Sequence, residues 1–164
     1  MSDGPTTAPN DVTRPLALVT GASTGIGRAL ADVFAENGFD LVITADDDAI
    51  ASAAEALRAT GCTVTAEQVD LRTPEGVEAL YTAATAAGAI TAAALNAGVG
   101  VGGRFDENDL DLDLGVVDLN CRSTVHLAKL LTRDMVRAGR GRLLFTSSIA
   151  ATAPGPYHAT YAAS

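Results

Sequence analysis

A serine and a tyrosine near the end of the sequence could together handle a proton. Ser148 follows a short apolar run, and Tyr161 lies further on, in a segment (157–164) that has the composition of a helix just starting. A hydroxyl can stabilise charge that develops on a substrate oxygen, and a phenol can act as a general acid or base. Each also has a structural interpretation, as a turn serine and as a tyrosine packed on a helix face. Asn120 stands inside a predicted helix, where a lone asparagine is otherwise a mild defect.

A glycine-rich turn near the start suggests a second kind of chemistry. Gly21, Gly25 and Gly27 stand between the apolar run at 16–19 and apolar residues at helical spacing. The start of such a helix presents unpaired N–H groups and a positive dipole end, which favour a phosphate. Glycine lets the backbone approach that phosphate and lets the helix pack close to the strand. Alone, a turn of this kind is a weak signal.

Three aspartates follow the second apolar run. An acid in the place of Asp46 can accept hydrogen bonds from an adenosine ribose and repel a 2′-phosphate. Three acids in a row also make a phosphate site unfavourable there. Asp47 and Asp48 are interpreted instead as the cap of the next helix.

Polar residues also end the third and fourth apolar runs. Asp70 could cap the helix that Thr73-Pro74 begins. The family resemblance given below implies a cofactor contact for Asp70 instead, and the two interpretations are nearly even. Asn96 opens an Asn-Ala-Gly sequence, for which the same resemblance implies a role beside the cofactor and in stabilising the sheet.

These residues need a scaffold that brings strand ends together. Strands are expected at residues 16–19, 41–43, 63–69, 91–95 and 142–147, with helical patterns between them. Right-handed crossovers between such strands give a parallel sheet with helices on both faces. Ligands bind at the carboxyl ends of such strands, beside the first strand. Apart from Asn120, in the long helical segment, and Tyr161, in the last segment, every candidate residue above falls at or just past such an end.

That long segment is expected over 106–138, broken near Asp113, with glycines at 139 and 141 ending it. Its apolar stripe is expected at Leu114, Val117, Cys121, Thr124, Val125, Ala128, Leu131 and Met135.

The string TGASTGIG between strand and helix, the Asn-Ala-Gly sequence, Asn120, and the Ser148–Tyr161 spacing together resemble the short-chain dehydrogenase/reductase family over residues 16–164. Leu95 departs from it, since an asparagine is usual there. The resemblance implies an α/β fold: a Rossmann-type doubly wound parallel sheet of strand order 3-2-1-4-5, with later strands missing. It also implies an NAD(P)-dependent oxidoreductase that transfers a hydride between nicotinamide and an alcohol or carbonyl substrate.

The resemblance assigns roles to individual residues. Tyr161 becomes the general acid/base, Ser148 binds the substrate oxygen, and Asn120 holds a water of the proton relay. The cofactor-binding residues are Gly21, Ser23, Thr24, Gly25, Ile26, Gly27, Asp46, Asp70, Leu71, Asn96, Ala97, Gly98 and Tyr161. In the family, the position that selects NAD aligns either with Asp46 or with Ala45, and both alignments favour NAD over NADP.

A free phenol has a pKa of about 10, too high for a good base near neutrality. The family places a lysine four residues after the tyrosine to stabilise the phenolate, but the sequence given ends at Ser164, one position earlier. We therefore expect the amino-terminal part of a dehydrogenase that is catalytic when complete. The alternative is that the chain as it stands is an inactive nucleotide-binding fragment or a pseudogene product.

Composition sets the remaining expectations. The 164 residues carry a net charge of −9, which argues against nucleic acid and anionic membranes as partners. A disordered tail over 1–14 and one domain over 15–164 are expected. Cys62 and Cys121 lack metal-ligand spacing, so no metal and a reducing, cytoplasmic location are expected. The partners expected are a small alcohol or ketone and, for the full-length form, further copies of the chain.

Overall fold

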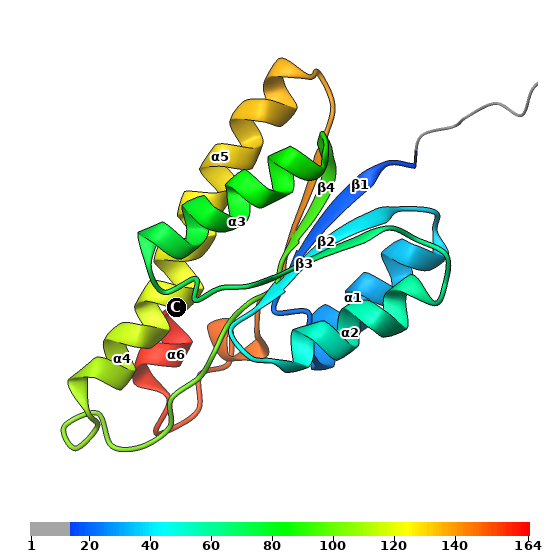
Figure 1. Cartoon of the computed structure of the whole chain (residues 1–164). Coiled ribbons are helices and arrows are strands. Elements are labelled where there is room, and N and C mark those ends of the chain that lie inside the picture. Colours follow the sequence, from blue (N-terminus) through cyan, green and yellow to red (C-terminus); the bar gives the residue numbers. More distant parts are fainter. Residues whose placement is uncertain (1–13) are drawn as a thin grey trace, which may run out of the picture.

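The computed structural model describes residues 14–164, and these form a five-stranded parallel sheet flanked by helices (Figure 1). The strands are β1 (Leu16–Thr20), β2 (Asp40–Ala45), β3 (Val64–Gln68), β4 (Ile90–Leu95) and β5 (Arg142–Phe145). The helices are α1 (Gly25–Glu36), α2 (Ala49–Arg58), α3 (Pro74–Ala87), α4 (Leu110–Val116), α5 (Thr124–Arg137) and α6 (Ala159–Ala163). A π-helical turn, Val117–Ser123, joins α4 to α5, and a 3₁₀ turn, Ile149–Ala151, follows β5. The strand order β3-β2-β1-β4-β5 confirms the predicted fold class.

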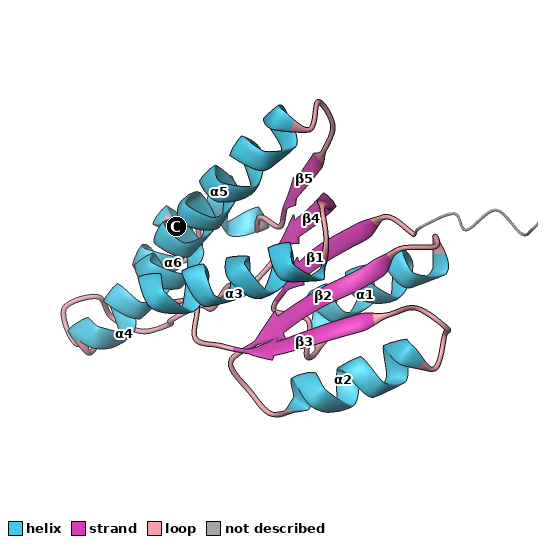
Figure 2. Ribbon diagram, turned by 45° about the horizontal axis from the view of Figure 1, so that its top comes forward, coloured by secondary structure: helices cyan, strands magenta, loops and turns pink. Residues whose placement is uncertain are grey.

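β1 lies at the centre of the sheet and is buried along its whole length. Because side chains alternate between the faces of a strand, Ala17 and Val19 pack into one core and Leu16 and Leu18 into the other. The first core is closed by α1 and α2, the second by α3 and α5 (Figure 2). Burial on both faces explains why β1 is continuously apolar in sequence.

Small side chains line the inner face of α1. Gly27, Ala31 and Ala35 are buried, whereas Ile26 and Val33 are 64% and 54% exposed. The larger apolar residues of this helix therefore do not all point into the core, and α1 lies close to the sheet.

The sequence pattern predicts an inner face of Ile50, Ala53, Ala54 and Leu57 for α2 and of Val77, Leu80, Tyr81 and Ala84 for α3. All of these are buried except Tyr81, which is partly buried. Thr73 caps α3 by accepting a hydrogen bond from the Gly76 N–H at 3.0 Å.

The prediction for the long helical segment is wrong in three respects. The helix begins at Leu110 rather than at 106, it is not broken near Asp113, and its apolar stripe is displaced as far as Val125. Ala128, Leu131 and Met135 face the core as predicted. The buried positions run Asp113, Val116, Leu119, Ser123, Leu127, Leu131 and Met135. Leu114, Val117 and Val125, expected in the stripe, are instead 49%, 42% and 69% exposed.

The residue types at the inner face explain this displacement. The buried positions keep a spacing of three or four residues through the π-helical turn. Two of them hold polar residues, Asp113 and Ser123, so a search for apolar residues at helical spacing places the inner face at neighbouring positions.

Smaller differences concern the ends of elements. β3 and β5 are shorter than predicted, and α6 begins at Ala159, after Tyr157, whose φ of 65° lies outside the helical region. The predicted tail lies outside the described residues except for Arg14, which donates hydrogen bonds to the carbonyls of Gly38 (3.2 Å) and Gly61 (2.7 Å).

β5 forms one edge of the sheet, and much of its surface is open. Leu144 is 44% exposed and Phe145 is 50% exposed, while Leu143 packs against the core that α3 and α5 cover. Within residues 14–164, no helix combines the length and the apolar character needed to cross a membrane.

Candidate functional site

Two cavities meet at the carboxyl ends of the strands. The larger, about 510 Å³, extends from the glycine turn toward β5, and the smaller, about 290 Å³, extends from the same turn toward β3. Both are lined by Gly21, Thr24, Ala97, Gly98 and Val99. They therefore form one cleft, at the edge of the sheet that the sequence predicted.

A third cavity, of about 560 Å³, lies at the opposite end of the strands, near Arg14, Asp40 and Gly88. None of the predicted site residues lines it. Its volume alone therefore does not make it the functional site.

The glycine turn depends on two positions. Gly21 has a φ of 65°, and a Cβ placed on it would lie 2.9 Å from the Ala97 Cα. A Cβ on Gly27 would overlap the Gly21 carbonyl oxygen and lie 2.5 Å from the Asn96 Nδ2. The turn and the start of α1 thus pack against each other and against the end of β4, with no room for a side chain. Gly25 and Gly27 line neither cavity, so they shape the turn from behind it.

The start of α1 is open to a ligand. Thr24, at the N-cap, makes no capping hydrogen bond through its side chain, and the first turn of α1 contains no acidic residue. The N-termini of α3 and α4, in contrast, are capped by Thr73 and Asp109. Unpaired N–H groups at a helix start bind anions well. Because Thr24 and Ile26 line the larger cavity, this helix start fits a phosphate group in the cleft.

Asn96 connects the strand ends that lie beneath the cleft. Its Nδ2 donates hydrogen bonds to the carbonyls of Thr20 (3.1 Å) and Gly21 (3.3 Å), and its Oδ1 accepts one from the Thr146 Oγ1 (2.9 Å). The buried Thr20 Oγ1 in turn accepts hydrogen bonds from the backbone N–H groups of Asn96 and Ala97. These contacts tie together the ends of β1, β4 and β5, as expected for a residue that stabilises the sheet.

The smaller cavity is acidic. Asp46, Asp70 and Leu71 line it as the sequence predicted, together with Ser23 and Asp47. The Ser23 Oγ donates a hydrogen bond to the Asp47 carboxylate at 2.8 Å, so Asp47 fixes the glycine turn as well as the Ala49 N–H.

Asp70 does not cap α3 with its side chain. Its Oδ1 accepts a hydrogen bond from the backbone N–H of Arg72, while Thr73 provides the cap. The side chain of Arg72 lies between two carboxylates, 3.4 Å from Asp46 and 3.5 Å from Asp70. Sequence reasoning missed Arg72, because its two partners meet only when β2 and β3 pair.

The three predicted catalytic residues all line the larger cavity. Asn120 lies in the π-helical turn, where its Oδ1 accepts a hydrogen bond from the Val99 N–H and its Nδ2 donates to the Val99 carbonyl, both at 2.9 Å. Its Nδ2 also donates to the Ser164 Oγ at 2.9 Å. The asparagine therefore fixes the loop that follows β4 against α6.

Ser148 and Tyr161 reach the cavity from different elements. The Ser148 Oγ accepts a hydrogen bond from the Ala150 N–H (3.2 Å) at the start of the 3₁₀ turn. The Tyr161 ring, on α6, lies against Gly100, where a Cβ would be 3.3 Å from the ring. Lys129 does not line the cavity. Lining residues that the sequence analysis did not assign to the site are Leu95, Val99, Gly100, Thr124, Phe145, Thr146, Ser147, Ala151 and Ser164.

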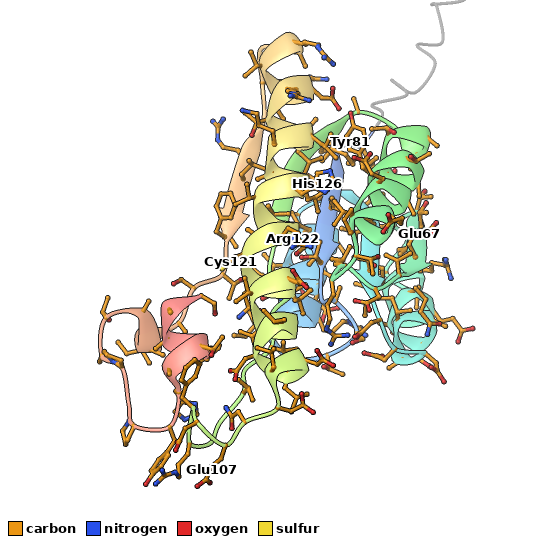
Figure 3. The ribbon with its side chains drawn as sticks, turned by 90° about the vertical axis from the view of Figure 1, so that its left-hand side faces the viewer. Glu67, Tyr81, Glu107, Cys121, Arg122 and His126 are labelled. Carbon is orange, nitrogen blue, oxygen red and sulfur yellow. The ribbon has the colours of Figure 1, made fainter. Side chains whose placement is uncertain are left out.

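The histidines and cysteines lie outside the cleft lining. His126 pairs with Glu78 at 2.8 Å across α3 and α5, and Figure 3 shows it on the same helical segment as Cys121 and Arg122. Cys62 is buried, Cys121 is only partly buried, and both are free thiols. No group of three or more His, Cys, Asp or Glu residues suited to a metal ion occurs in the described part of the chain.

The chain belongs to the short-chain dehydrogenase/reductase family of oxidoreductases, since the family model described as "short chain dehydrogenase" matches residues 15–164. A 1-deoxy-11-beta-hydroxypentalenate dehydrogenase from Streptomyces avermitilis is 39% identical over 153 residues, which cover 90% of this chain and 57% of that protein.

Two solved structures of similar fold carry different cofactors. A short-chain dehydrogenase/reductase from Burkholderia phymatum, in complex with NAD, is 31% identical with a TM-score of 0.88, covering 92% of this chain and 54% of that one. An L-sorbose reductase from Gluconobacter frateurii, complexed with NADPH and L-sorbose, is 31% identical with a TM-score of 0.85, covering 92% and 58%. The chain thus spans about half the length of the curated relatives it matches.

Proposed function

We propose that residues 15–164 form the cofactor-binding domain of an NAD(P)-dependent oxidoreductase that interconverts an alcohol and a carbonyl compound. The observation that carries the proposal is the single cleft, which joins an uncapped helix start to Asn120, Ser148 and Tyr161. Family membership and the NAD and NADPH complexes of similar structures support the same assignment.

In this proposal the cofactor lies along the carboxyl ends of the strands. The N–H groups at the start of α1 bind its phosphates, and the residues of the smaller cavity bind its adenosine. Ser23 and Asp47 hold the turn in shape. Gly27 allows the helix to pack against the turn, and Gly25 provides the positive φ, 58°, at the start of the helix. Asn96, Ala97 and Gly98 form the wall between the two halves.

NAD is the cofactor that this end of the cleft favours. Asp46 lines the smaller cavity at the end of β2, where a carboxylate accepts hydrogen bonds from ribose hydroxyls and repels a 2′-phosphate. Ala45 also lines that cavity, but it is buried and carries no charge. The discrimination between NAD and NADP is therefore assigned to the Asp46 carboxylate.

The bound nicotinamide supplies the hydride acceptor or donor, and the chain supplies the proton chemistry. Tyr161 donates or accepts the proton at the substrate oxygen, and the Ser148 Oγ donates a hydrogen bond to the same oxygen as its charge develops. Asn120 holds a water of the proton relay. Val99 and Gly100 line the same cavity as Tyr161. Because both residues are small and apolar, they leave space for a substrate beside the Tyr161 ring.

We further propose that the 164-residue chain itself turns over negligibly. A phenol needs a nearby cation to become a good base near neutrality, and no lysine or arginine of the described residues lines the larger cavity. The complete protein would supply that cation, would act on an alcohol or ketone in the cytoplasm, and would assemble with further copies of itself.

A fluorescence titration with NADH tests the binding proposal. We expect saturable binding, weakened by Asp46→Asn and unchanged by Asp48→Asn, because Asp48 is exposed and lies outside the cavity lining. Absence of binding by the folded chain would contradict the proposal. Rapid NAD-linked oxidation of secondary alcohols by the same chain would contradict only the statement about turnover.

A further inference from the structure

Arg72 lies between two carboxylates at the proposed adenosine end of the cleft. It follows β3, and its guanidinium lies 3.4 Å from the Asp46 carboxylate and 3.5 Å from the Asp70 carboxylate. Both carboxylates line the smaller cavity. Asp47 lines it as well, whereas Arg72 itself does not. Arg72 therefore offsets the charge of this acidic rim from beside the cavity, through its ion pairs with Asp46 and Asp70.

Arg72 interacts with the two carboxylates as an ion pair and does not form bidentate hydrogen bonds with them. Charge-assisted hydrogen bonds between guanidinium and carboxylate measure about 2.7–2.9 Å. At its longer distances, the Arg72 side chain makes no hydrogen bond to any described residue, and it is 38% exposed. Its five N–H donors are therefore available to a further acceptor. Exposed pairs of this kind contribute only about 0–1 kcal/mol to stability, so folding does not depend on them.

The stem of Arg72 passes close to a neighbouring helix. A Cβ placed on Gly115, in α4, would be 3.9 Å from the Arg72 Cδ and Nε. The glycine therefore leaves room for the arginine beside α4, while the guanidinium lies near Asp46 and Asp70.

We infer that Arg72 is a specificity-determining residue of the cofactor site: it sets how strongly the acidic rim rejects a 2′-phosphate. This inference rests on the proposed function. The Asp46 carboxylate favours a free ribose hydroxyl, but a cation within 4 Å offsets part of its repulsion toward a second anion. Arg72 can also offer its free N–H donors to that phosphate. Both effects make the cleft more tolerant of NADPH than Asp46 alone would allow.

The test compares dissociation constants for NADH and NADPH, and for 5′-AMP and 2′,5′-ADP, whose binding involves only the adenosine end. In Arg72→Gln we expect the ratio of the NADPH to the NADH dissociation constant to rise about tenfold, the factor that about 1.4 kcal/mol represents. The two fragments should show the same change in ratio. Arg72→Lys, which keeps the charge, should stay within about threefold of the parent chain.

Arg104→Gln is the matched control. Arg104 is also exposed and pairs with two carboxylates, Asp106 at 2.8 Å and Glu107 at 2.9 Å, but neither of these acids lines the cleft, whereas both partners of Arg72 do. It should leave the ratio unchanged, and thermal melts of all variants should agree with the parent chain to within a few degrees.

The possible results distinguish failure of the proposed dinucleotide binding from failure of the role given to Arg72. If the parent chain binds neither dinucleotide, the proposed function fails. If it binds them and Arg72→Gln weakens both equally or neither, the inference about Arg72 is wrong while the proposed function stands. An equal shift in Arg104→Gln would assign the effect to net charge and would also overturn the inference.

Discussion

Gly27 and Gly115 both lie within helices, but a methyl group at each would meet different surroundings. At Gly27 it would overlap the Gly21 carbonyl oxygen, which belongs to the rigid turn, whereas at Gly115 it would meet Arg72 at an ordinary 3.9 Å. We expect Gly27→Ala to lower the free energy of unfolding by about 1–3 kcal/mol. Gly115→Ala should raise it by about 0.5–1 kcal/mol, since alanine is the better helix former. Urea denaturation measures both, and equal effects would contradict the packing described for the turn.

Two buried threonines provide a second matched comparison. Thr20 and Thr44 are paired in register on β1 and β2, and both are almost completely buried. The Thr20 Oγ1 accepts two backbone hydrogen bonds, whereas the Thr44 Oγ1 has no hydrogen-bond partner among the described residues.

Replacement by valine, which has the same shape, should therefore act in opposite directions. Thr20→Val leaves two buried N–H groups unpaired and should cost about 2–4 kcal/mol of unfolding free energy. Thr44→Val removes an unpaired hydroxyl and should stabilise the chain by about 1 kcal/mol. Urea unfolding midpoints give the comparison, and a destabilised Thr44→Val variant would indicate a partner for that hydroxyl.

At this scale the sequence was informative wherever a residue directly follows a strand. Gly21, Asp46 and Asn96 line the cleft because strand ends of a parallel sheet lie side by side, and alternating elements predict such a sheet. Contacts between two strand ends were not predictable. The approach of Arg72 to Asp46 and the bond from Ser23 to Asp47 depend on loop conformations that no local pattern encodes.

Helices α3 and α5 are joined by a polar contact that depends on pH. The Tyr81 hydroxyl donates a hydrogen bond to the Asp134 carboxylate at 2.5 Å (Figure 3 labels Tyr81). This hydrogen bond, with burial and the negative charge of Asp134, raises the pKa of Tyr81 above its ordinary value. The folded chain thus holds the phenolic proton more tightly than the unfolded chain does.

The sign of the pH dependence follows from that shift. The contribution of Tyr81 is fully present below the unfolded pKa of about 10 and is lost as pH rises through the higher folded value. At pH 7, Tyr81→Phe should therefore lower the unfolding free energy by about 1 kcal/mol. Above pH 10 the difference between the two chains should shrink. A difference that stays constant in urea titrations up to pH 11 would contradict this assignment.

Among the elements, sequence periodicity succeeded for α2 and α3 and failed for the segment that contains Asn120. The predicted stripe fails there because polar Asp113 and Ser123 take buried positions while apolar residues such as Leu114 stay exposed. The sequence pattern at 117–123 also did not predict the π-helical turn. The same turn carries the side chain that binds Val99 and Ser164. The local departure from a regular helix is therefore found where a candidate site residue is positioned.

For the molecule as a whole, the open edge at β5 governs behaviour in solution. An uncovered parallel edge strand with half-exposed Leu144 and Phe145 favours association with other chains. We expect the purified 164-residue chain to self-associate as its concentration rises, and Leu144→Lys to reduce that association. Light scattering after size-exclusion chromatography measures both, and a chain that stays monomeric and melts sharply at high concentration would contradict the expectation.

The central claim is that a nicotinamide dinucleotide binds along the carboxyl ends of the strands. The most direct test is to add NADH to the ¹⁵N-labelled chain and to map the amide signals that change. The account predicts changes at the glycine turn, at Asp46 and Asp70, and around Asn120 and Ser148. Changes confined to the cavity at the opposite end of the strands, around Arg14 and Gly88, would contradict it.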